Sequence, residues 1–372
     1  MIFKSKNKLS VFDKIVLTFN IISACALLLS YLAPFVSPVS WPAIAILGFG
    51  YQVLLLTNIL MLAYWLLRRK NHFLISMISI ALGFFALTAN FGFRFSGAKS
   101  GEKASPAGIR MMEYNVHEFF GRVDKYDNDE VHYAKANIVQ IIKDKQPDIV
   151  NMEEFYSLKA DKGAIIDSIK KALKSDYYYF KPFNENKWGP KGTAIFTKFP
   201  IVDSGVVATP GIINNLTIFV DVKYQSQIIR IYCVHLAAVK IKDEEKRKYL
   251  SGGGLSFSKL LFIESKLKSA FQLRSQQVAL IKQHTEQCPY PYIIAGDFND
   301  TPNSYSVNKI SKGLKNAFIE KGSGFGITYY SNFPKLHIDY ILTSPQFDVL
   351  NYETIDKKLS DHKPIISDLR LN

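Results

Sequence analysis

The chain has 372 residues, which is too long for one small domain and long enough for a large hydrophobic core with something else attached. Its formal net charge of +14 favours anionic partners such as nucleic acid, lipid head groups or phosphorylated substrates. The three cysteines, Cys25, Cys233 and Cys288, lie far apart, which argues against a disulfide framework and against a zinc cluster.

Three apolar segments open the chain, at Ile15–Val36, Pro42–Leu67 and Phe73–Phe93. Each reaches the roughly 20 residues that a membrane-spanning helix needs, and none contains an acidic or basic residue. A cleaved signal peptide would be shorter and would stand alone, and helices buried in a soluble domain would show a polar face. The segments therefore predict a membrane domain over residues 1–95 with three transmembrane helices.

Basic residues are distributed unequally around these segments. Seven basic residues are predicted on one side of the membrane, namely Lys4, Lys6, Lys8, Lys14, Arg68, Arg69 and Lys70. Three are predicted on the other side, namely Arg94, Lys99 and Lys103. The positive-inside rule then places the N-terminus in the cytoplasm and everything beyond Phe93 outside it. We expect a multi-pass protein of the cell (inner) membrane with an extracytoplasmic C-terminal part, joined through a linker at residues 96–108.

From residue 109 onward, strand-like and helix-like segments alternate. Strands are predicted at 109–116, 148–154, 177–180, 193–197, 216–224, 227–236, 292–296 and 337–342, and helices at 133–145, 164–173 and 274–287. Polar residues gather where these strands end. The pattern indicates one mixed α and β domain over residues 109–372.

Residues 237–271 depart from this alternation. They read as two helical pieces around a hinge at residues 252–254, and the second piece has apolar residues at helical spacing. Three interpretations stay open for this insertion: a solvated surface excursion, a lid, or a basic amphipathic piece that rests on the membrane.

The stretch Gly296–Asn299 ends the apolar strand at 292–296. Because side chains alternate along a strand, Asp297 and Asn299 project to the same side as the backbone leaves it. Gly296 leaves room for a close approach. A carboxylate and an amide aimed at one point suit a site that handles a phosphate and its attacking water, and the alternative is an Asx turn capped by Asp297.

Other polar residues stand inside or at the ends of the remaining predicted strands, or, as with Asp361 and His362, in a tight turn that follows them. They are Asn115, Glu153, Glu154, His235, Asp339, Asp361 and His362. Taken singly, each has a structural explanation, such as a turn-forming asparagine or a solvated strand end. A carboxylate among apolar neighbours, as at Asp339, needs a partner.

The order of these motifs resembles that of the endonuclease/exonuclease/phosphatase superfamily, the DNase I-like fold. The matching pieces are Tyr114–Val116, Pro147–Val150 leading to Glu154, Val234–Leu236, Gly296–Asn299, Ile338–Ile341 and Ser360–Pro364. The resemblance covers residues 109–372. It implies an α+β (α/β sandwich) fold, a four-layer sandwich of two mixed β-sheets flanked by helices, which three transmembrane helices would precede.

The resemblance also implies a metal site. Glu154 matches the metal-binding glutamate, since Glu153 falls where relatives often have glutamine. Asn115 matches the asparagine that helps to organise the metal and the phosphate, and Asp361 matches a second metal-site acid. The implied cofactor is Mg²⁺ or Mn²⁺, for which oxygen ligands are suitable.

Five further residues are implied to act in catalysis. Asp297 matches the residue that orients or deprotonates the attacking water, and Asn299 matches the one that holds this water and the transition-state oxygens. Asp339 matches the carboxylate that pairs with the terminal histidine, here His362. His235 matches the histidine that contacts the phosphate or assists the leaving group.

Two positions depart from the family pattern. His337 stands where many relatives carry arginine, and His117 stands where some nucleases place a further acid. The second departure argues against a repair-type nuclease and leaves the residues named above untouched.

The predicted function is a membrane-anchored, divalent-metal-dependent phosphoester hydrolase, either a phosphodiesterase or nuclease or a phosphatase. The expected partners are a phosphoester substrate (nucleic acid, lipid head group or small phosphoester) and the lipid bilayer, and the sequence indicates no protein partner. The alternative is a catalytically silent, membrane-anchored binding module with the same fold.

Overall fold

The computed structural model describes residues 8–94, 103–105, 107–121, 128–159, 163–187, 189–209, 215–245, 248–249, 256–330 and 335–372. The chain divides into two compact units. The helical unit comprises Met1–Asn90, Val239–Ser275 and Asp300–Asn308, and the sandwich unit comprises Phe91–Ala238, Gln276–Asn299 and Lys309–Asn372. Most of the predicted linker lies outside the described residues.

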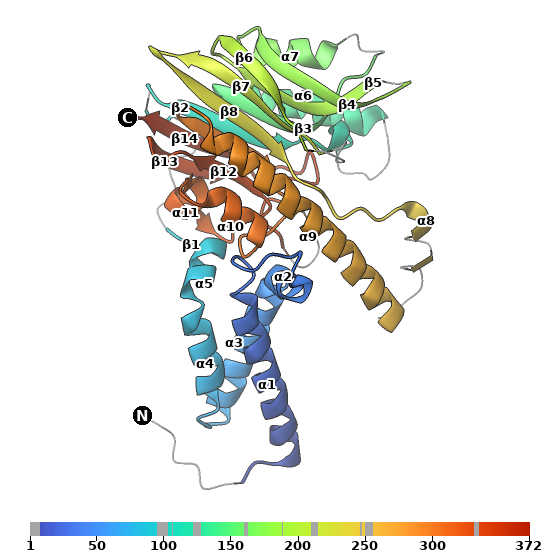
Figure 1. Ribbon diagram of the computed structural model, residues 1–372, viewed down its shortest axis with the longest axis vertical. Coiled ribbons are helices and arrows are strands. Elements are labelled where there is room, and N and C mark those ends of the chain that lie inside the picture. The colour runs from blue at the N-terminus through green and yellow to red at the C-terminus, as the bar shows by residue number, and fades with distance from the viewer. Residues whose placement is uncertain are drawn as a thin grey trace. The chain divides into compact units, whose positions relative to one another are not determined.

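The helical unit begins with a group of helices between residues 8 and 90 (Figure 1). They are α1 (Val11–Ser30), α2 (Pro42–Phe49), α3 (Tyr51–Leu67), α4 (Phe73–Leu82) and α5 (Phe84–Asn90). Only α1 among them is long and apolar enough to cross a membrane as one helix. Of the three predicted transmembrane helices, the second and third are each a bent pair, with 63° between α2 and α3 and 66° between α4 and α5, so the described residues contain up to three spans if each pair counts as one.

Both bends occur at a glycine, which hydropathy alone does not mark as a break. Gly50 joins α2 to α3, and Gly83 joins α4 to α5. A Cβ atom at Gly83 would lie 2.0 Å from the ring of Tyr31, so no other residue fits beside that ring. The Tyr31 hydroxyl donates to the carbonyl oxygen of Ser79 at 2.9 Å, in the last turn of α4. The bend therefore accommodates the aromatic side chain of Tyr31, the residue that follows α1.

The helices α1, α3 and α4 have apolar side chains on the outside and polar ones inside. The exposed side chains include Phe12, Ile15, Phe19, Ile22, Leu28, Leu29, Leu60, Leu67 and Ile78. Inside, Asn20 Nδ2 donates to Ser76 Oγ at 2.7 Å, and Ser76 Oγ donates to Asn58 Oδ1 at 3.2 Å. Asn58 Nδ2 also donates to the carbonyl oxygen of Ser23 at 3.1 Å. Polar contacts therefore join the three helices.

The rest of the helical unit includes α8 (Asp243–Glu245), the first half of α9 (Phe257–Glu286) and the start of α10 (Tyr305–Ser311). α9 is one helix, whereas the sequence predicts a piece up to residue 271 and a separate helix at 274–287. No glycine or proline stands between Phe257 and Glu286, so nothing in the sequence ends the helix there. The predicted glycine hinge at residues 252–254 lies outside the described residues.

The sandwich unit contains two six-stranded mixed sheets within the described residues. The first has the order β10 (Lys315–Asn316), β12 (Asp339–Thr343), β9 (Tyr292–Asp297), β8 (Gln227–His235), β7 (Thr217–Tyr224) and β6 (Ile201–Val207). The second has the order β13 (Phe347–Thr354), β14 (Ile365–Leu371), β2 (Ile109–Asn115), β3 (Ile149–Tyr156), β5 (Gly189–Thr197) and β4 (Tyr177–Asn186). Each sheet has one central parallel pair, β8 with β9 and β2 with β3. A short pair, β1 (Gly92–Phe93) with β11 (Ser323–Gly324), lies apart from both sheets.

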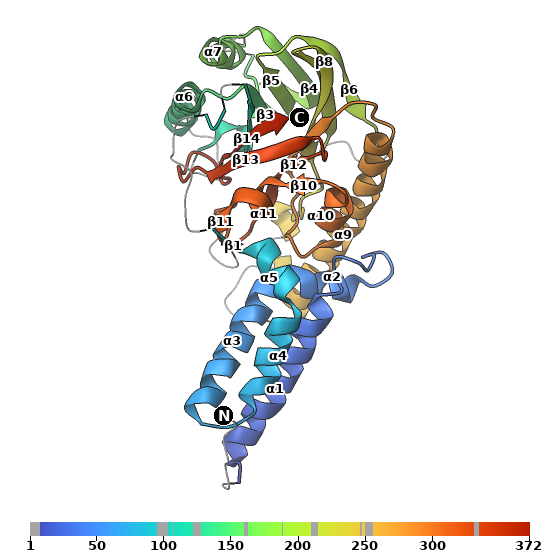
Figure 2. The same ribbon diagram turned by 90° about the vertical axis from the view of Figure 1, so that its left-hand side faces the viewer.

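The sheets pack face to face, and helices lie outside them (Figure 2). Ile231 and Ile293 of the first sheet and Met111 of the second belong to the apolar core between the sheets. The other face of the second sheet packs through a second apolar cluster against α6 (Asn128–Lys145) and α7 (Ala164–Leu173). α11 (Ala317–Lys321) lies against β12 and β13. The predicted α+β sandwich of two mixed sheets flanked by helices is confirmed.

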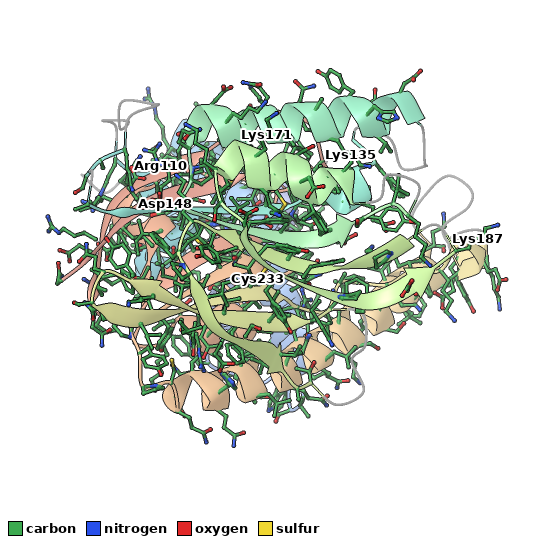
Figure 3. The ribbon with its side chains drawn as sticks, turned by 90° about the horizontal axis from the view of Figure 1, so that it is seen from above. Arg110, Lys135, Asp148, Lys171, Lys187 and Cys233 are labelled. Atoms are coloured by element: carbon green, nitrogen blue, oxygen red, sulfur yellow. The ribbon has the colours of Figure 1, made fainter. Side chains whose placement is uncertain are left out.

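Charged residues fix the amino ends of β2 and β3. The backbone N–H of Arg110 donates to Asp148 Oδ2 at 2.8 Å, and its guanidinium donates to the buried carboxylate of Asp368 at 2.7 Å. Figure 3 shows Arg110 and Asp148 close together at one end of the strands. Since β2 and β3 run parallel, their opposite ends also lie together, and there the strands carry Asn115 and Glu154.

Candidate active site

The register of the central strands brings the predicted residues to one edge of the sandwich. His235 is paired with Asp297 across the parallel strands β8 and β9. Asp297 is in turn paired with Asp339 across the antiparallel strands β9 and β12. In the second sheet, Asn115 ends β2 and is paired with Glu153 of β3. The parallel pairs β8 with β9 and β2 with β3 therefore both end in polar side chains at this edge.

Asp297 is the centre of this group and is 1% exposed. Its Oδ2 accepts from Asn115 Nδ2 and from Asn299 Nδ2, each at 3.0 Å, and its Oδ1 accepts from the backbone N–H of Asn299 at 2.8 Å. The Nε2 atoms of His235 and His362 each lie 3.7 Å from Oδ2. Burial raises the pKa of Asp297 well above its usual value, although the charge of His362 and the N–H of Asn299 oppose this shift.

The bond from the Asn299 N–H shows that Asp297 does cap an Asx turn, as the alternative interpretation expects. Asn299 has φ +52°, and its Nδ2 also donates to the carbonyl oxygen of Leu236 at 3.0 Å. The turn and the site are thus the same structure. Gly296 allows β8 to lie close to β9, because a Cβ atom at position 296 would lie 2.0 Å from the carbonyl oxygen of Val234.

His362 and Asp339 form a buried pair. His362 Nδ1 lies 2.9 Å from Asp339 Oδ1 and 3.0 Å from Oδ2. Burial opposes a charge on this imidazole, but the carboxylates of Asp339, Asp297 and Asp361 outweigh it and raise the pKa of His362 well above its usual value. The pairing fixes the ring with Nδ1 toward Asp339 and Nε2 toward Asp297.

A β-bulge separates the two glutamates of β3. The register with β5 shifts between Met152 and Phe155, and Glu154 has φ +50°. Glu153 consequently points into the sandwich, where Cys233 Sγ donates to its Oε1 at 2.9 Å. Glu154 points to the site edge, where Lys191 Nζ donates to its Oε2 at 2.8 Å.

Glu154 is held as an anion. Burial opposes its ionisation, but the charges of Lys191, His235 and His117 lower its pKa to about 2. Lys191 Nζ also donates to Glu118 Oε1 at 2.5 Å, so one ammonium group joins two carboxylates.

Asp361 lies farther from the buried group, and its side chain is 34% exposed. Its Oδ1 is 3.7 Å from His117 Nδ1 and accepts from Ser360 Oγ at 3.2 Å. Within the described residues no direct hydrogen bond or ion pair joins Asp361 to Asn115 or Glu154. Ser360 Oγ connects Asp361 to Asn115 indirectly, because it also bonds to the carbonyl oxygen of Asn115 at 2.8 Å.

A divalent cation is compatible with the donors at this edge. Asn115, Glu154 and Asp361 offer an amide oxygen and two carboxylates, the donors that Mg²⁺ and Mn²⁺ prefer, and Glu154 stays ionised. The ligand atoms of Asp297, Asp339 and His362 lie within 4.8 Å of one another and could also hold a metal ion. Both sets already have protein partners. Both oxygens of Asp339 face His362 and three N–H groups bind Asp297, while Glu154 Oε2 accepts from Lys191 and Asn115 Oδ1 accepts from the N–H of His117.

Sequence reasoning does not assign a role to Lys191, Glu118 or His117. Residues 117–119 have φ values of 45°, 53° and 63°, a left-handed run that is costly for residues other than glycine. This run follows Asn115 directly, and it brings Glu118 to Lys191 and His117 to Asp361. Lys191 lies in the observed strand β5 but before the predicted strand at 193–197, so the sequence pattern carries no signal for this part of the site.

His337, which stands where many relatives carry arginine, has a structural role. The ring is 1% exposed, stacks on Tyr340 with 4.7 Å between centroids, and meets Phe318 edge-on. Burial lowers the pKa of His337 to about 3, so this residue is a neutral part of the core.

The chain belongs to the endonuclease/exonuclease/phosphatase family, whose model matches residues 112–362. A model for a domain of unknown function matches residues 13–90. No curated protein matches the chain at a significant level.

Several solved structures share the fold. The endonuclease/exonuclease/phosphatase from Beutenbergia cavernae is 19% identical, with a TM-score of 0.51, and the match covers 71% of this chain and 72% of that one. The human Nocturnin catalytic domain with bound sulfate is 19% identical, with a TM-score of 0.51 and coverage of 72% and 95%. D. rerio TDP2, humanized by 14 mutations, is 17% identical, with a TM-score of 0.50 and coverage of 71% and 99%. At these identities the likeness concerns the fold alone.

Proposed function

We propose that the protein is a divalent-metal-dependent phosphoester hydrolase in which Asp297 is the general base. The observation that carries this proposal is the environment of Asp297: a buried carboxylate, oriented by three N–H donors, with two imidazoles 3.7 Å from the same oxygen. Burial raises its pKa and so strengthens it as a proton acceptor. Membership of the endonuclease/exonuclease/phosphatase family supports the same reaction class.

In this proposal, Asn115 and Asn299 orient Asp297, which takes a proton from the attacking water. Asn299 also holds that water. His362, kept in place by Asp339, presents a charged Nε2–H to the phosphoryl oxygens as negative charge develops on them. His235 contacts the phosphate or protonates the leaving group.

Glu154, Asn115 and Asp361 are the proposed metal ligands. A bound Mg²⁺ or Mn²⁺ would neutralise the charge on the phosphoryl group and so help a nucleophile to approach it. The pKa of Glu154 is lowered to about 2, so this carboxylate is ionised at neutral pH.

Glu154→Gln is expected to weaken Mg²⁺ binding at least about tenfold, because the substitution replaces an anionic ligand by a neutral one. The measurement is the Mg²⁺-dependent rise in the thermal unfolding midpoint of the full-length protein, which needs no substrate. Glu185→Gln is the matched control, since Glu185 is an exposed residue of β4 paired with Lys159. An unchanged Mg²⁺ response in Glu154→Gln would remove Glu154 from the ligand set.

We also infer that the protein is anchored in the cell membrane by several passes, with a membrane domain at residues 1–95, a linker at 96–108 and a catalytic domain at 109–372. Support comes from α1 and from the exposed apolar and buried polar side chains of α1, α3 and α4, a distribution that suits lipid surroundings and not water. The charge asymmetry of the connecting segments supports an N-terminus in the cytoplasm and a catalytic domain on the other side.

This topology predicts that protease added to intact spheroplasts cuts the catalytic domain. An epitope placed before α1 should survive the same treatment, because residues 1–10 face the cytoplasm in this arrangement. Permeabilised spheroplasts, in which both ends become accessible, are the control. Protection of the catalytic domain in intact spheroplasts would reverse the topology.

The direct test of the activity is hydrolysis by the full-length protein in detergent, with Mg²⁺ or Mn²⁺ and with EDTA. The substrates are bis-p-nitrophenyl phosphate, p-nitrophenyl phosphate, DNA, RNA and lipid phosphoesters, which separate diesterase from monoesterase and nuclease from lipid hydrolase. Turnover that EDTA abolishes is expected for at least one substrate. No turnover on any of them would favour a catalytically silent binding module.

A further inference from the structure

The first half of α9 has an open apolar face. Phe257, Leu260 and Leu261 are 76%, 50% and 49% exposed. Their spacing of three and four residues puts them on one stripe of the helix. Glu264 and Lys268 continue the stripe toward the C-terminal side, since they stand three and seven residues after Leu261, so the apolar part of the stripe ends at Leu261. Large apolar side chains gathered in this way on an exposed helix mark a surface that contacts something.

The opposite face of the same helix is covered by the chain itself. Tyr249 stacks on Phe262 with 4.5 Å between ring centroids and 13° between planes. Lys266 Nζ donates to both oxygens of Glu245, at 2.6 and 2.8 Å. Glu245 and Tyr249 therefore support the helix from one side, and among the described residues they leave the stripe of Phe257, Leu260 and Leu261 exposed.

The composition of the segment indicates its partner. Between residues 239 and 275 there are nine Lys and Arg and four Asp and Glu, so an anionic surface is favoured. The segment belongs to the same compact unit as α1–α5, and the Phe271 ring lies against the Phe49 ring at 6.0 Å between centroids. Phe49 ends α2, and Trp41 at the start of α2 is 66% exposed, as in the aromatic belt of a membrane interface.

We propose that the first half of α9 docks on the surface of the anionic lipid bilayer in which α1 is held, with Phe257, Leu260 and Leu261 inserted among the acyl chains and Lys268 at the head groups. This inference rests on the membrane anchoring proposed above and is independent of the proposed chemistry. It assigns the described part of the insertion within α9, from Phe257 onward, as an interfacial element.

The test uses a fluorescent label and the full-length protein in proteoliposomes. Cys25→Ser and Cys288→Ser remove the reachable thiols, and Cys233 stays, because it is fully buried. Leu261→Cys then carries an NBD label on the open face. Ser269→Cys carries it at an exposed position outside the stripe, about 80° around the helix from Leu261, as the matched control. Lipids with a nitroxide on the acyl chain quench a label that enters the bilayer.

We expect quenching of the label at position 261 to exceed that at position 269 at least about threefold in vesicles of phosphatidylcholine and phosphatidylglycerol. Lys268→Glu should weaken docking by roughly fivefold, and pure phosphatidylcholine should weaken it as well. Equal quenching at the two positions overturns the proposal. So does an effect at position 261 that follows the ratio of protein to lipid, since that would indicate a second copy of the chain.

A separate label on native Cys25, which is exposed on α1, tests the membrane anchor apart from the docking of α9. Quenching at position 25 without quenching at position 261 leaves the anchor intact and rejects docking of α9. Absence of quenching at both positions rejects the anchor together with the docking.

Discussion

Replacing Asp297 with asparagine is expected to lower kcat by at least about 10³-fold, because the substitution removes the proposed general base and keeps the shape of the side chain. The same protein should be as stable as the wild type or more stable. Asp297 is buried, and burial raises its pKa, so the folded state bears a cost for its ionised form. A large loss of turnover without a loss of stability is the signature of a group retained for chemistry. Both quantities are measured on the full-length protein, as turnover and as the thermal unfolding midpoint.

Asp203→Asn is the matched control for this experiment. Asp203 is an exposed residue of β6, and its carboxylate bonds only to the N–H of Ser204 among the contacts that the structure describes. The control should keep full turnover. Near-normal turnover in Asp297→Asn would remove the mechanism, whereas a drop in both turnover and stability would make Asp297 a structural residue. His362→Ala should resemble Asp297→Asn, since it removes the imidazole that faces the same oxygen.

The sequence predicts much of the sandwich because its strands follow simple rules. The hairpin of β7 and β8 alternates apolar and polar residues around a short turn, and both strands form within a residue of their predicted limits. The strand that ends at Asp297 is an apolar run closed by a glycine, and it is observed as β9. Local patterns of this kind carry the information for local structure.

Features that depend on distant contacts could not be predicted in this way. The bends at Gly50 and Gly83 are invisible to hydropathy, since the residues on both sides are equally apolar. The bulge in β3 is likewise invisible, although it decides that Glu153 points inward and Glu154 outward. Lys191 reaches the site only because β5 pairs with β3, a relation that a single strand pattern does not contain.

The site residues show the same division. Their strand ends could be predicted, and the resemblance to the family selected them from many polar residues. Their partners are a property of the three-dimensional register: His235 faces Asp297 because β8 and β9 are parallel and in step, and Asp339 faces Asp297 from the antiparallel strand on the other side. Glu113 and Glu153, two fully buried acids behind this group, have no sequence signal that predicts their burial together.

The burial of Glu113 and Glu153 predicts that the stability of the protein depends on pH. Glu153→Gln is expected to stabilise the protein above pH 7 by up to about 3 kcal/mol and to have little effect near pH 4.5. Burial raises the pKa of Glu153 to about 7, against hydrogen bonds with Cys233 and Glu113 that lower it. Burial also raises the pKa of Glu113 well above its usual value. Figure 3 places Cys233 in the interior of the sandwich, on the strand that faces Glu153.

The direction follows from proton linkage. The folded-state pKa of Glu153 lies above the unfolded value of 4.5, so its protonated form is favoured by folding. Between pH 4.5 and about 7 the unfolded chain releases this proton while the folded chain keeps it, so wild-type stability falls as the pH rises through that window. Glutamine cannot ionise, and its oxygen can still accept the bond from Cys233. Glu153→Gln therefore does not lose stability as the pH rises through this window.

The measurement is the unfolding midpoint of wild type and Glu153→Gln between pH 4.5 and pH 8, with the difference expected to grow with pH. Glu286→Gln is the control, because Glu286 is exposed at the end of α9, and its difference from wild type should not vary with pH in the same way. A Glu153→Gln variant that is less stable at every pH would show that Glu153 is needed as a carboxylate. In that case Glu113 and Glu153 would carry a negative charge that stabilises the folded protein. A buried charge needs a partner, so a cation would have to lie beside the two acids.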